Sequence, residues 1–250
     1  MFCLCFFFFS SRGRHTSFLP VSWARRYVKE TVIEDTKFDL DGDRVSRVRD
    51  GSSTEVWAAI REWNATDAAA GMACGADSGL TWEQKFDAWV ASFERAPRAT
   101  GYGETFRVPT PHGDRVLESP RLECAEVAML LRLTFAAWYE LPFYLQGWDA
   151  STRQSMYAGH FGFVDSEGNN IGRFPSFRTR YEDHRGRWSA GDTWPSDSRL
   201  RGYHLGDDDE NAFLEPGAGA GAYFDELFLN KRVGYFARLI PLYFGSANLA

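Results

Sequence analysis

The sequence of 250 residues lacks an apolar run long enough to cross a membrane. A membrane-spanning helix needs about 20 consecutive apolar residues, and the longest candidate, residues 2–9, is far shorter. Basic residues follow this run at Arg12 and Arg14, whereas a signal peptide carries its charge before the apolar region. We therefore expect no transmembrane segment, and the sequence indicates no particular compartment.

The first residues resemble translated sequencing-adapter text of the kind that begins many conceptual reading frames. Residues 6–16, with four phenylalanines followed by Ser-Ser-Arg-Gly-Arg-His-Thr, carry this resemblance. We therefore expect residues 1–25 to be non-native or disordered. The remainder, residues 26–250, is predicted to form a single globular domain with its core at residues 80–180 and a C-terminal helical extension at residues 207–250.

Cysteine is scarce, which excludes a disulfide framework. Two of the four cysteines, Cys3 and Cys5, lie near the start of the chain, and a C-x-C pair without further ligands does not make a zinc site. The other two, Cys74 and Cys124, could pair, although their spacing alone does not show it. Either of them could equally be a free thiol.

An excess of basic residues is also lacking, because 34 Asp and Glu outweigh 28 Lys and Arg to give a net charge of −6. A nucleic-acid partner is therefore not expected. Asp39, Asp41 and Asp43 are spaced as in the first half of a calcium loop, but Arg44 occupies the position that requires glycine. The glycine-rich residues 215–221 have no following Lys-Ser/Thr and follow no strand. We expect neither a metal nor a cofactor.

Aromatic residues, in contrast, are abundant, with nine Trp and twenty-one Phe. They imply a heavily aromatic core or an aromatic-lined cleft able to bind sugars or peptides. Arg178, Arg180, Trp188 and Trp194 are candidates for the wall of such a cleft, although an aromatic and basic surface over the core is the simpler interpretation.

Hydrophobic periodicity, capping and turn residues predict an α+β protein. The helices are expected at residues 54–63, 81–95, 120–138 and 223–239, and the strands at residues 105–108, 141–148, 156–165 and 171–174. The helix that ends at Trp138 is apolar on nearly every side, so it must be buried by other elements. We expect it at the centre of the fold, packed against a small antiparallel sheet, with helical additions at both ends.

Cys124 lies near the start of this central helix, and His160 follows on a later predicted strand. A helix N-terminus and a nearby imidazolium both lower the pKa of a thiol, and the thiolate is the nucleophile in cysteine chemistry. Glycines at positions 159 and 162 would leave the approach to His160 open. The pair is therefore a candidate catalytic dyad, with Cys124 as nucleophile and His160 as base and then acid. A buried apolar cysteine and a structural histidine are the alternatives.

The segments around these two residues resemble the transglutaminase-like, papain-type core. Family members open a central helix with a cysteine in a C-x-x-x-A-x-L-L-R pattern and carry the histidine on a following strand. The matching positions, within a resemblance that covers residues 80–180, are Cys124, Ala128, Leu130, Leu131, Arg132, Pro142 and His160. The resemblance implies cleavage or formation of amide bonds through an acyl-enzyme, with a peptide or glycopeptide as substrate.

Two departures weaken this resemblance. Glu123 and Ala125 flank the cysteine where the family has a small residue and Asp or Asn. The position expected to face His160 falls near Phe174, Pro175 or Ser176, none of which is a carboxylate or amide. Asp165, Asn170, Asp183 and His184 are other possible orienting residues, although no motif selects any of them.

Two functions are therefore open. The first is a cysteine-dependent amide hydrolase or acyltransferase that uses Cys124 and His160. The second is a catalytically inactive domain of the same fold that binds a peptide or glycan, or that has a purely structural role. We prefer the first, because Cys124 and His160 occur together in the order of helix followed by strands that the catalytic pair needs. The absence of a third catalytic residue at the expected place argues for the second.

Overall fold

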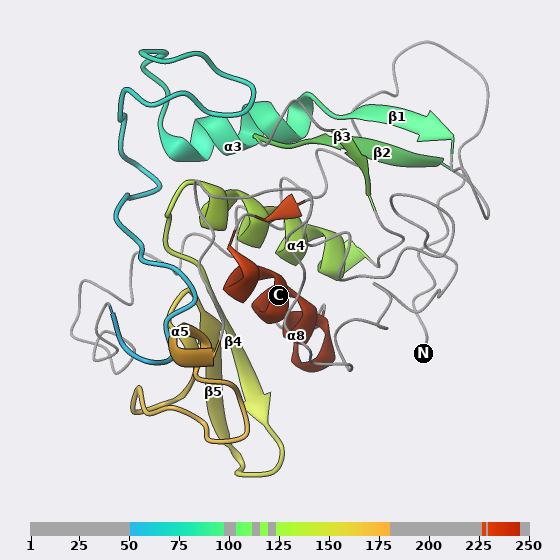
Figure 1. Ribbon diagram of the computed structural model, residues 1–250. Helices are drawn as coiled ribbons and strands as arrows, with labels where there is room; N and C mark the ends of the chain where they lie inside the picture. The colour runs from blue at the N-terminus through green and yellow to red at the C-terminus, as the bar shows by residue number, and fades with distance from the viewer. Residues whose placement is uncertain are drawn as a thin grey trace.

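The computed structural model describes residues 51–97, 104–111, 116–119, 124–180, 227–228 and 230–245 (Figure 1). The predictions for residues 1–25, for the aspartates at 39–43 and for residues 181–226 lie outside these ranges. The described elements, in chain order, are α3 (Trp82–Ala91), β1 (Glu94–Pro97), β2 (Glu104–Pro109), β3 (Val116–Glu118), α4 (Cys124–Trp138), β4 (Tyr144–Asp149), β5 (Gln154–Gly159), β6 (Gly162–Asp165), α5 (Phe177–Arg180) and α8 (Lys231–Tyr243).

The protein is α+β, as predicted. Its two three-stranded sheets are antiparallel, with strand orders β1-β2-β3 and β4-β5-β6. Figure 1 shows α4 in the middle of the molecule, with α3 and the first sheet on one side and α8 on the other, followed by the second sheet. No helix in the described part of the chain is both long and apolar enough to cross a membrane.

The central position of α4 is confirmed by its burial. Its residues from Leu131 to Ala137 are all buried, including the polar Arg132 and Thr134. Arg132 Cζ lies 3.1 Å from the centre of the Trp63 ring, and its Nη2 donates to Glu83 at 2.8 Å. This arginine therefore fastens α4 to α3 through an ion pair and to the segment before α3 through a cation–π contact.

Helix α8 runs antiparallel to α4. At one end, the indole Nε1 of Trp138 donates to the carbonyl of Leu227 at 2.8 Å. Toward the other end, burial lowers the pKa of Arg238 to about 10, and the negative charge of Glu126 opposes that shift. Helix α8 begins at Lys231, where the side chain of Asn230 caps it by accepting from the N–H of Arg232 at 3.0 Å, and it ends at Tyr243, beyond the predicted end at residue 239. The predicted start, at residues 223–226, lies outside the described residues.

Helix α3 begins where the capping box predicts. Thr81 and Gln84 bond reciprocally through side chain and backbone. The helix ends at Ala91 and not near Arg95, because Ser92 turns its hydroxyl back to the carbonyl of Trp89 at 2.6 Å and Glu94 begins β1.

The helix predicted at residues 54–63 is wrong. Backbone N–H groups of this segment are used elsewhere: Val56 and Trp57 donate to the carbonyl of His160, and Ile60 and Arg61 donate to that of Glu140. The apolar spacing that suggested a helix reflects Val56, Trp57 and Trp63, which are buried from an irregular chain, while Ile60 is 66% exposed. Tertiary hydrogen bonds have overridden the local pattern.

The strand predicted at residues 156–165 is two strands. The chain reverses at His160 and Phe161, so that Gly159 and Gly162 face each other across the β5–β6 hairpin. Gly162 has φ +96°, and a Cβ on it would lie 2.5 Å from the carbonyl oxygen of Thr54. A Cβ on Gly159 would clash with the carbonyl oxygen of Phe143. The glycines therefore allow a tight reversal and close packing, and β6 takes the place of the third strand predicted at residues 171–174.

Gly162→Ala is expected to destabilise the fold by about 3 kcal/mol, because the new methyl group combines an unfavourable φ with a clash against backbone. Gly172→Ala is the matched control, since a Cβ there meets nothing within 4 Å, and it should change stability by less than about 1 kcal/mol. Urea unfolding of both variants measures the difference. Equal stabilities would contradict the packing described for this hairpin.

Candidate functional site

His160 lies in the turn of the β5–β6 hairpin and is half-buried. Its backbone N–H donates to the carbonyl of Phe143 at 2.9 Å, and its ring Nδ1 lies 3.0 Å from the same oxygen. The N–H of Phe143 also points to Nδ1, at 3.2 Å. The imidazole is thus held against the backbone of Phe143, with the Trp57 ring centre 6.1 Å from its own.

Cys124 is the first residue of α4 as described, in agreement with its predicted place at the start of the central helix. The position of its side chain is outside the described part of the structure. A thiol at this end of a helix would experience the favourable dipole that the sequence suggested, and the prediction about its pKa stays a prediction.

The described backbone does not bring these two residues together. An α-helix rises about 1.5 Å per residue, so the first and last residues of α4 lie about 21 Å apart. His160 is joined to the chain just beyond the last residue: it bonds to Phe143, and Trp57 beside it donates its indole N–H to the carbonyl of Leu141 at 2.9 Å. His160 therefore lies near the C-terminal end of α4, whereas Cys124 is at its N-terminal end.

Among the candidate orienting residues, Asp165 has a different role. Its carboxylate accepts from the backbone N–H groups of Glu167 and Asn169 at 2.8 and 3.0 Å and so closes the turn after β6. Asn170 forms a bridge with Val164 at the sheet edge. Phe174 stacks on Phe163 with ring centres 3.9 Å apart. Asp183 and His184 lie outside the described residues.

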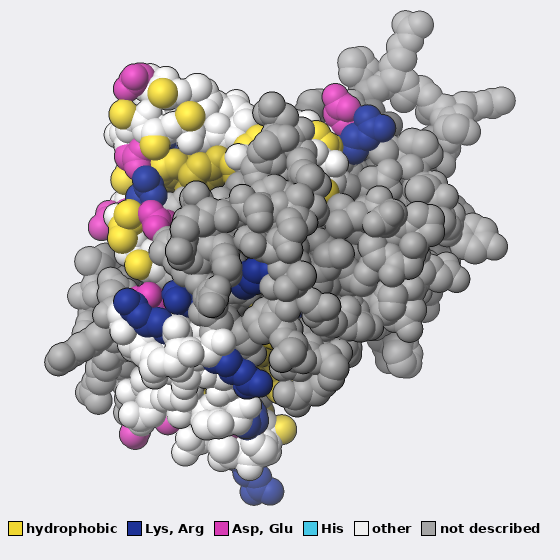
Figure 2. Space-filling view, viewed as in Figure 1, with side chains coloured by type: hydrophobic (Ala, Val, Ile, Leu, Met, Phe, Trp, Pro, Cys, Tyr) yellow, Lys and Arg dark blue, Asp and Glu magenta, His cyan; other side chains and the backbone are white. Residues whose placement is uncertain are grey.

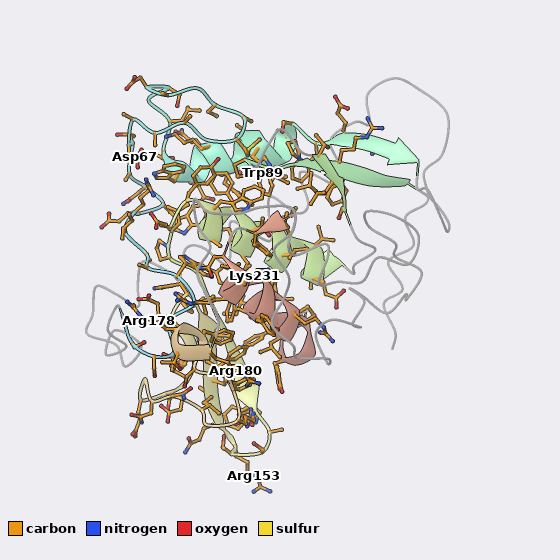
Figure 3. All side chains as sticks on the ribbon, viewed as in Figure 1. Asp67, Trp89, Arg153, Arg178, Arg180 and Lys231 are labelled. Carbon is orange, nitrogen blue, oxygen red and sulfur yellow. The ribbon has the colours of Figure 1, made fainter. Side chains whose placement is uncertain are left out.

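The arginines proposed for a cleft wall lie in α5. Arg178 donates to Glu55 at 2.8 Å, and its backbone N–H donates to Ser53 at 3.0 Å, so it secures α5 to the segment that precedes Trp57. Arg180 is exposed, and Figure 3 places it close to the second sheet. Figure 2 shows Lys and Arg side chains along this part of the surface. Trp188 and Trp194 lie outside the described residues.

A buried polar cluster between α3 and the loop before it was not predicted. Lys85 is fully buried, and its Nζ donates to the carbonyls of Asp67 and Ala69 at 2.8 and 2.6 Å while lying 4.2 Å from the centre of the Trp82 ring. The carboxylate of Asp67, labelled in Figure 3, accepts from Arg61 at 2.7 Å and from the Trp82 indole at 3.2 Å. These bonds join the members of the cluster to one another, so the cluster holds the loop in place against α3.

A second unpredicted pair joins Asp149 at the end of β4 to Arg173. Arg173 Nη1 donates to the buried carboxylate at 2.7 Å, and the hydroxyl and N–H of Ser151 donate to it at 2.7 and 3.0 Å. The hydrogen bond from Arg173, followed by those from Ser151, holds the pKa of Asp149 well below its usual range. The Asp-x-Ser spacing is a turn signal that could have located this end of the β4–β5 hairpin.

Trp148 differs from the other described tryptophans. Trp57, Trp63, Trp82, Trp89 and Trp138 each donate the indole N–H to a named oxygen. Trp89, labelled in Figure 3 between α3 and α4, is an example: it donates to the carbonyl of Pro109 at 3.1 Å. Trp148 is 63% exposed, and within the described part of the chain its indole N–H has no such bond. Alternation along β4 was the signal that could have marked it as a surface residue.

Comparison of the chain with protein-family models, with curated proteins and with solved structures finds no match. The likeness to the transglutaminase-like core therefore rests on the sequence positions that suggested it.

Asp149→Asn should lower the free energy of unfolding at neutral pH. It should also reduce the slope with which that free energy falls as the pH is lowered. A carboxylate whose pKa is depressed in the folded state stabilises the fold above its ordinary pKa of about 3.9, and this contribution is lost as the pH falls toward the depressed value. Urea unfolding at several values between pH 7 and pH 3 measures the slope. Arg173→Met should flatten the same slope, because it removes the main cause of the shift. An unchanged slope in Asp149→Asn would contradict this assignment.

Proposed function

We propose that this protein is a non-catalytic domain that binds a peptide or a glycan, and that it does not use Cys124 and His160 as a dyad. The observation that carries the proposal is the attachment of His160 to the backbone of Phe143, beyond the end of α4 opposite to Cys124. A general base must reach the nucleophile within about 2.6–3.2 Å or through one water. A separation that spans a helix of this length does not meet that condition.

The surroundings of His160 add support. In a catalytic triad a third side chain orients the histidine ring from the side opposite to the nucleophile, whereas the ring of His160 is held by the backbone of Phe143. The nearest carboxylate in the sequence, Asp165, closes the turn after β6 with its own bonds. The space that a side chain would fill at Gly159 and Gly162 is taken by the backbone carbonyls of Phe143 and Thr54. These glycines therefore do not open a path for a substrate.

A ligand-binding role agrees with the distribution of aromatic residues. Most described aromatic rings form the core, as the composition suggested, but Trp148 remains exposed. Tryptophan is a frequent contact residue at binding surfaces, because it offers a large flat ring together with an N–H donor.

The proposal predicts that His160 has no influence on the reactivity of Cys124. In the full chain, the rate of alkylation of Cys124 by iodoacetamide near pH 7 should agree within about twofold between wild type and His160→Ala, because an unassisted thiol reacts according to its own pKa. Mass spectrometry of the Cys124 peptide measures the rate, and the Cys74 peptide from the same digest is the internal control. Complete resistance of Cys124 to alkylation would equally support the proposal.

A fall of about tenfold or more in His160→Ala, with wild-type Cys124 reacting rapidly below pH 7, would overturn the proposal. That outcome would restore the cysteine hydrolase or acyltransferase. A binding experiment completes the test: Cys124→Ser should retain whatever peptide or glycan the wild-type chain retains.

A further inference from the structure

The two faces of the second sheet differ in their surroundings. On the face toward α8, Leu145, Met156, Ala158 and Phe163 belong to the main core. On the opposite face, Tyr144, Tyr157 and Val164 form a separate small cluster with Phe161. We refer to this second side as the outer face of the sheet.

The register of the strands determines which residues share the outer face. In an antiparallel ladder, residues directly opposite each other point to the same side, and alternate residues of a strand do so as well. Trp148 pairs with Ser155, Gln146 pairs with Tyr157, and Tyr157 pairs with Val164. Val164 in turn bridges to Asn170. Trp148, Gln146, Ser155 and Asn170 therefore surround the buried Tyr157 and Val164.

This face carries no charged side chain at any position of β4, β5 or β6. The acidic residues of these strands, Asp149 and Asp165, alternate to the other side. What remains exposed is one large aromatic ring with two amides, and a half-buried hydroxyl lies beside it. Amide and hydroxyl groups both donate and accept hydrogen bonds.

We propose that the outer face binds a neutral carbohydrate, with one sugar ring stacked on the indole of Trp148 and its hydroxyls bonded to Gln146 and Ser155. Asn170 lies three strands across from Gln146, about 14 Å away, and so contacts only a neighbouring sugar of the same chain. Sugar hydroxyls are donors and acceptors at once, as are these side chains, and the C–H face of a pyranose fits a flat apolar ring. Gln146 lies two residues from Trp148 on the same strand, about 7 Å away, and Ser155 is its direct neighbour across the ladder. This proposal rests on the binding function proposed above and specifies its ligand.

The size and charge of the surface favour a sugar over a protein. A stable protein interface covers about 800 Å² on each partner, whereas one tryptophan buries about 150–250 Å² and the neighbouring polar groups are small. The described strand positions of this face carry no charge with which to select an acidic or basic peptide.

The test is a titration of the full-length chain with neutral hexasaccharides of β-1,4-linked glucose, N-acetylglucosamine and xylose, followed by calorimetry and tryptophan fluorescence. At least one should bind, and Trp148→Ala should weaken binding at least about tenfold, while Trp148→Phe retains part of it. Gln146→Ala should have a smaller effect in the same direction. Ile60→Ala is the matched control, since Ile60 is equally exposed but lies in another part of the fold, and its affinity should equal that of wild type.

Unchanged binding in Trp148→Ala would place the glycan elsewhere and overturn this inference while leaving the binding function intact. If none of the sugars binds and a peptide array gives a ligand, the carbohydrate inference is likewise overturned and the binding function is kept. His160-dependent alkylation of Cys124 would instead remove the proposed function, whatever the sugars do. Because Trp148 is exposed, its variants should retain the wild-type melting temperature, which verifies that lost binding does not reflect unfolding.

Discussion

The fold depends on the burial of a helix that has almost no polar face. An apolar helix of this kind is unfavourable in water, and it is stable only when neighbouring elements cover it on all sides. In this protein α3 covers one side of α4, and α8 covers another in an antiparallel direction. One continuous hydrophobic cluster results, and it includes residues of α3, α4, α8 and the inner face of the second sheet.

Large indole rings fill this core without leaving their polar atoms unsatisfied. A buried N–H without a partner costs about 1–3 kcal/mol, which would cancel much of what the burial of the ring contributes. Four of the five acceptors are backbone carbonyls. Those of Leu141 and Pro142 lie in the irregular segment between α4 and β4, that of Pro109 lies at the end of β2, and that of Leu227 lies shortly before α8. The tryptophans therefore fasten the irregular segments to the core as well as filling it. Trp148 differs, because its indole is exposed and makes no such bond among the described residues.

Local signals were sufficient to predict those elements whose bonds are local. The capping box of Thr81 and Gln84, the apolar helix ending at Trp138 and the turn after Asp165 could all be located from neighbouring residues. The segment that contains Val56 could not, because its N–H groups bond to a carbonyl about a hundred residues away.

The candidate site was predictable only in part, for the same reason. The place of Cys124 at a helix start followed from local sequence, but the place of His160 depended on how β5 and β6 were divided. The two glycines around His160 suggest open space when considered alone. Only the packed backbones of Thr54 and Phe143 identify them as a reversal point, and that reversal puts the histidine into a turn at the far end of α4.

The bonds of Val56 connect parts of the chain that are synthesised far apart. Its N–H donates to His160 at 2.7 Å, and its carbonyl accepts from the side chain of Asn230 at 3.0 Å. A chain still lacking residue 230 would leave this carbonyl without its native partner, and loop closure over such a separation must be completed before the contact contributes. The full set of native bonds around Val56 is therefore available only once the chain has been made as far as residue 230, where α8 begins.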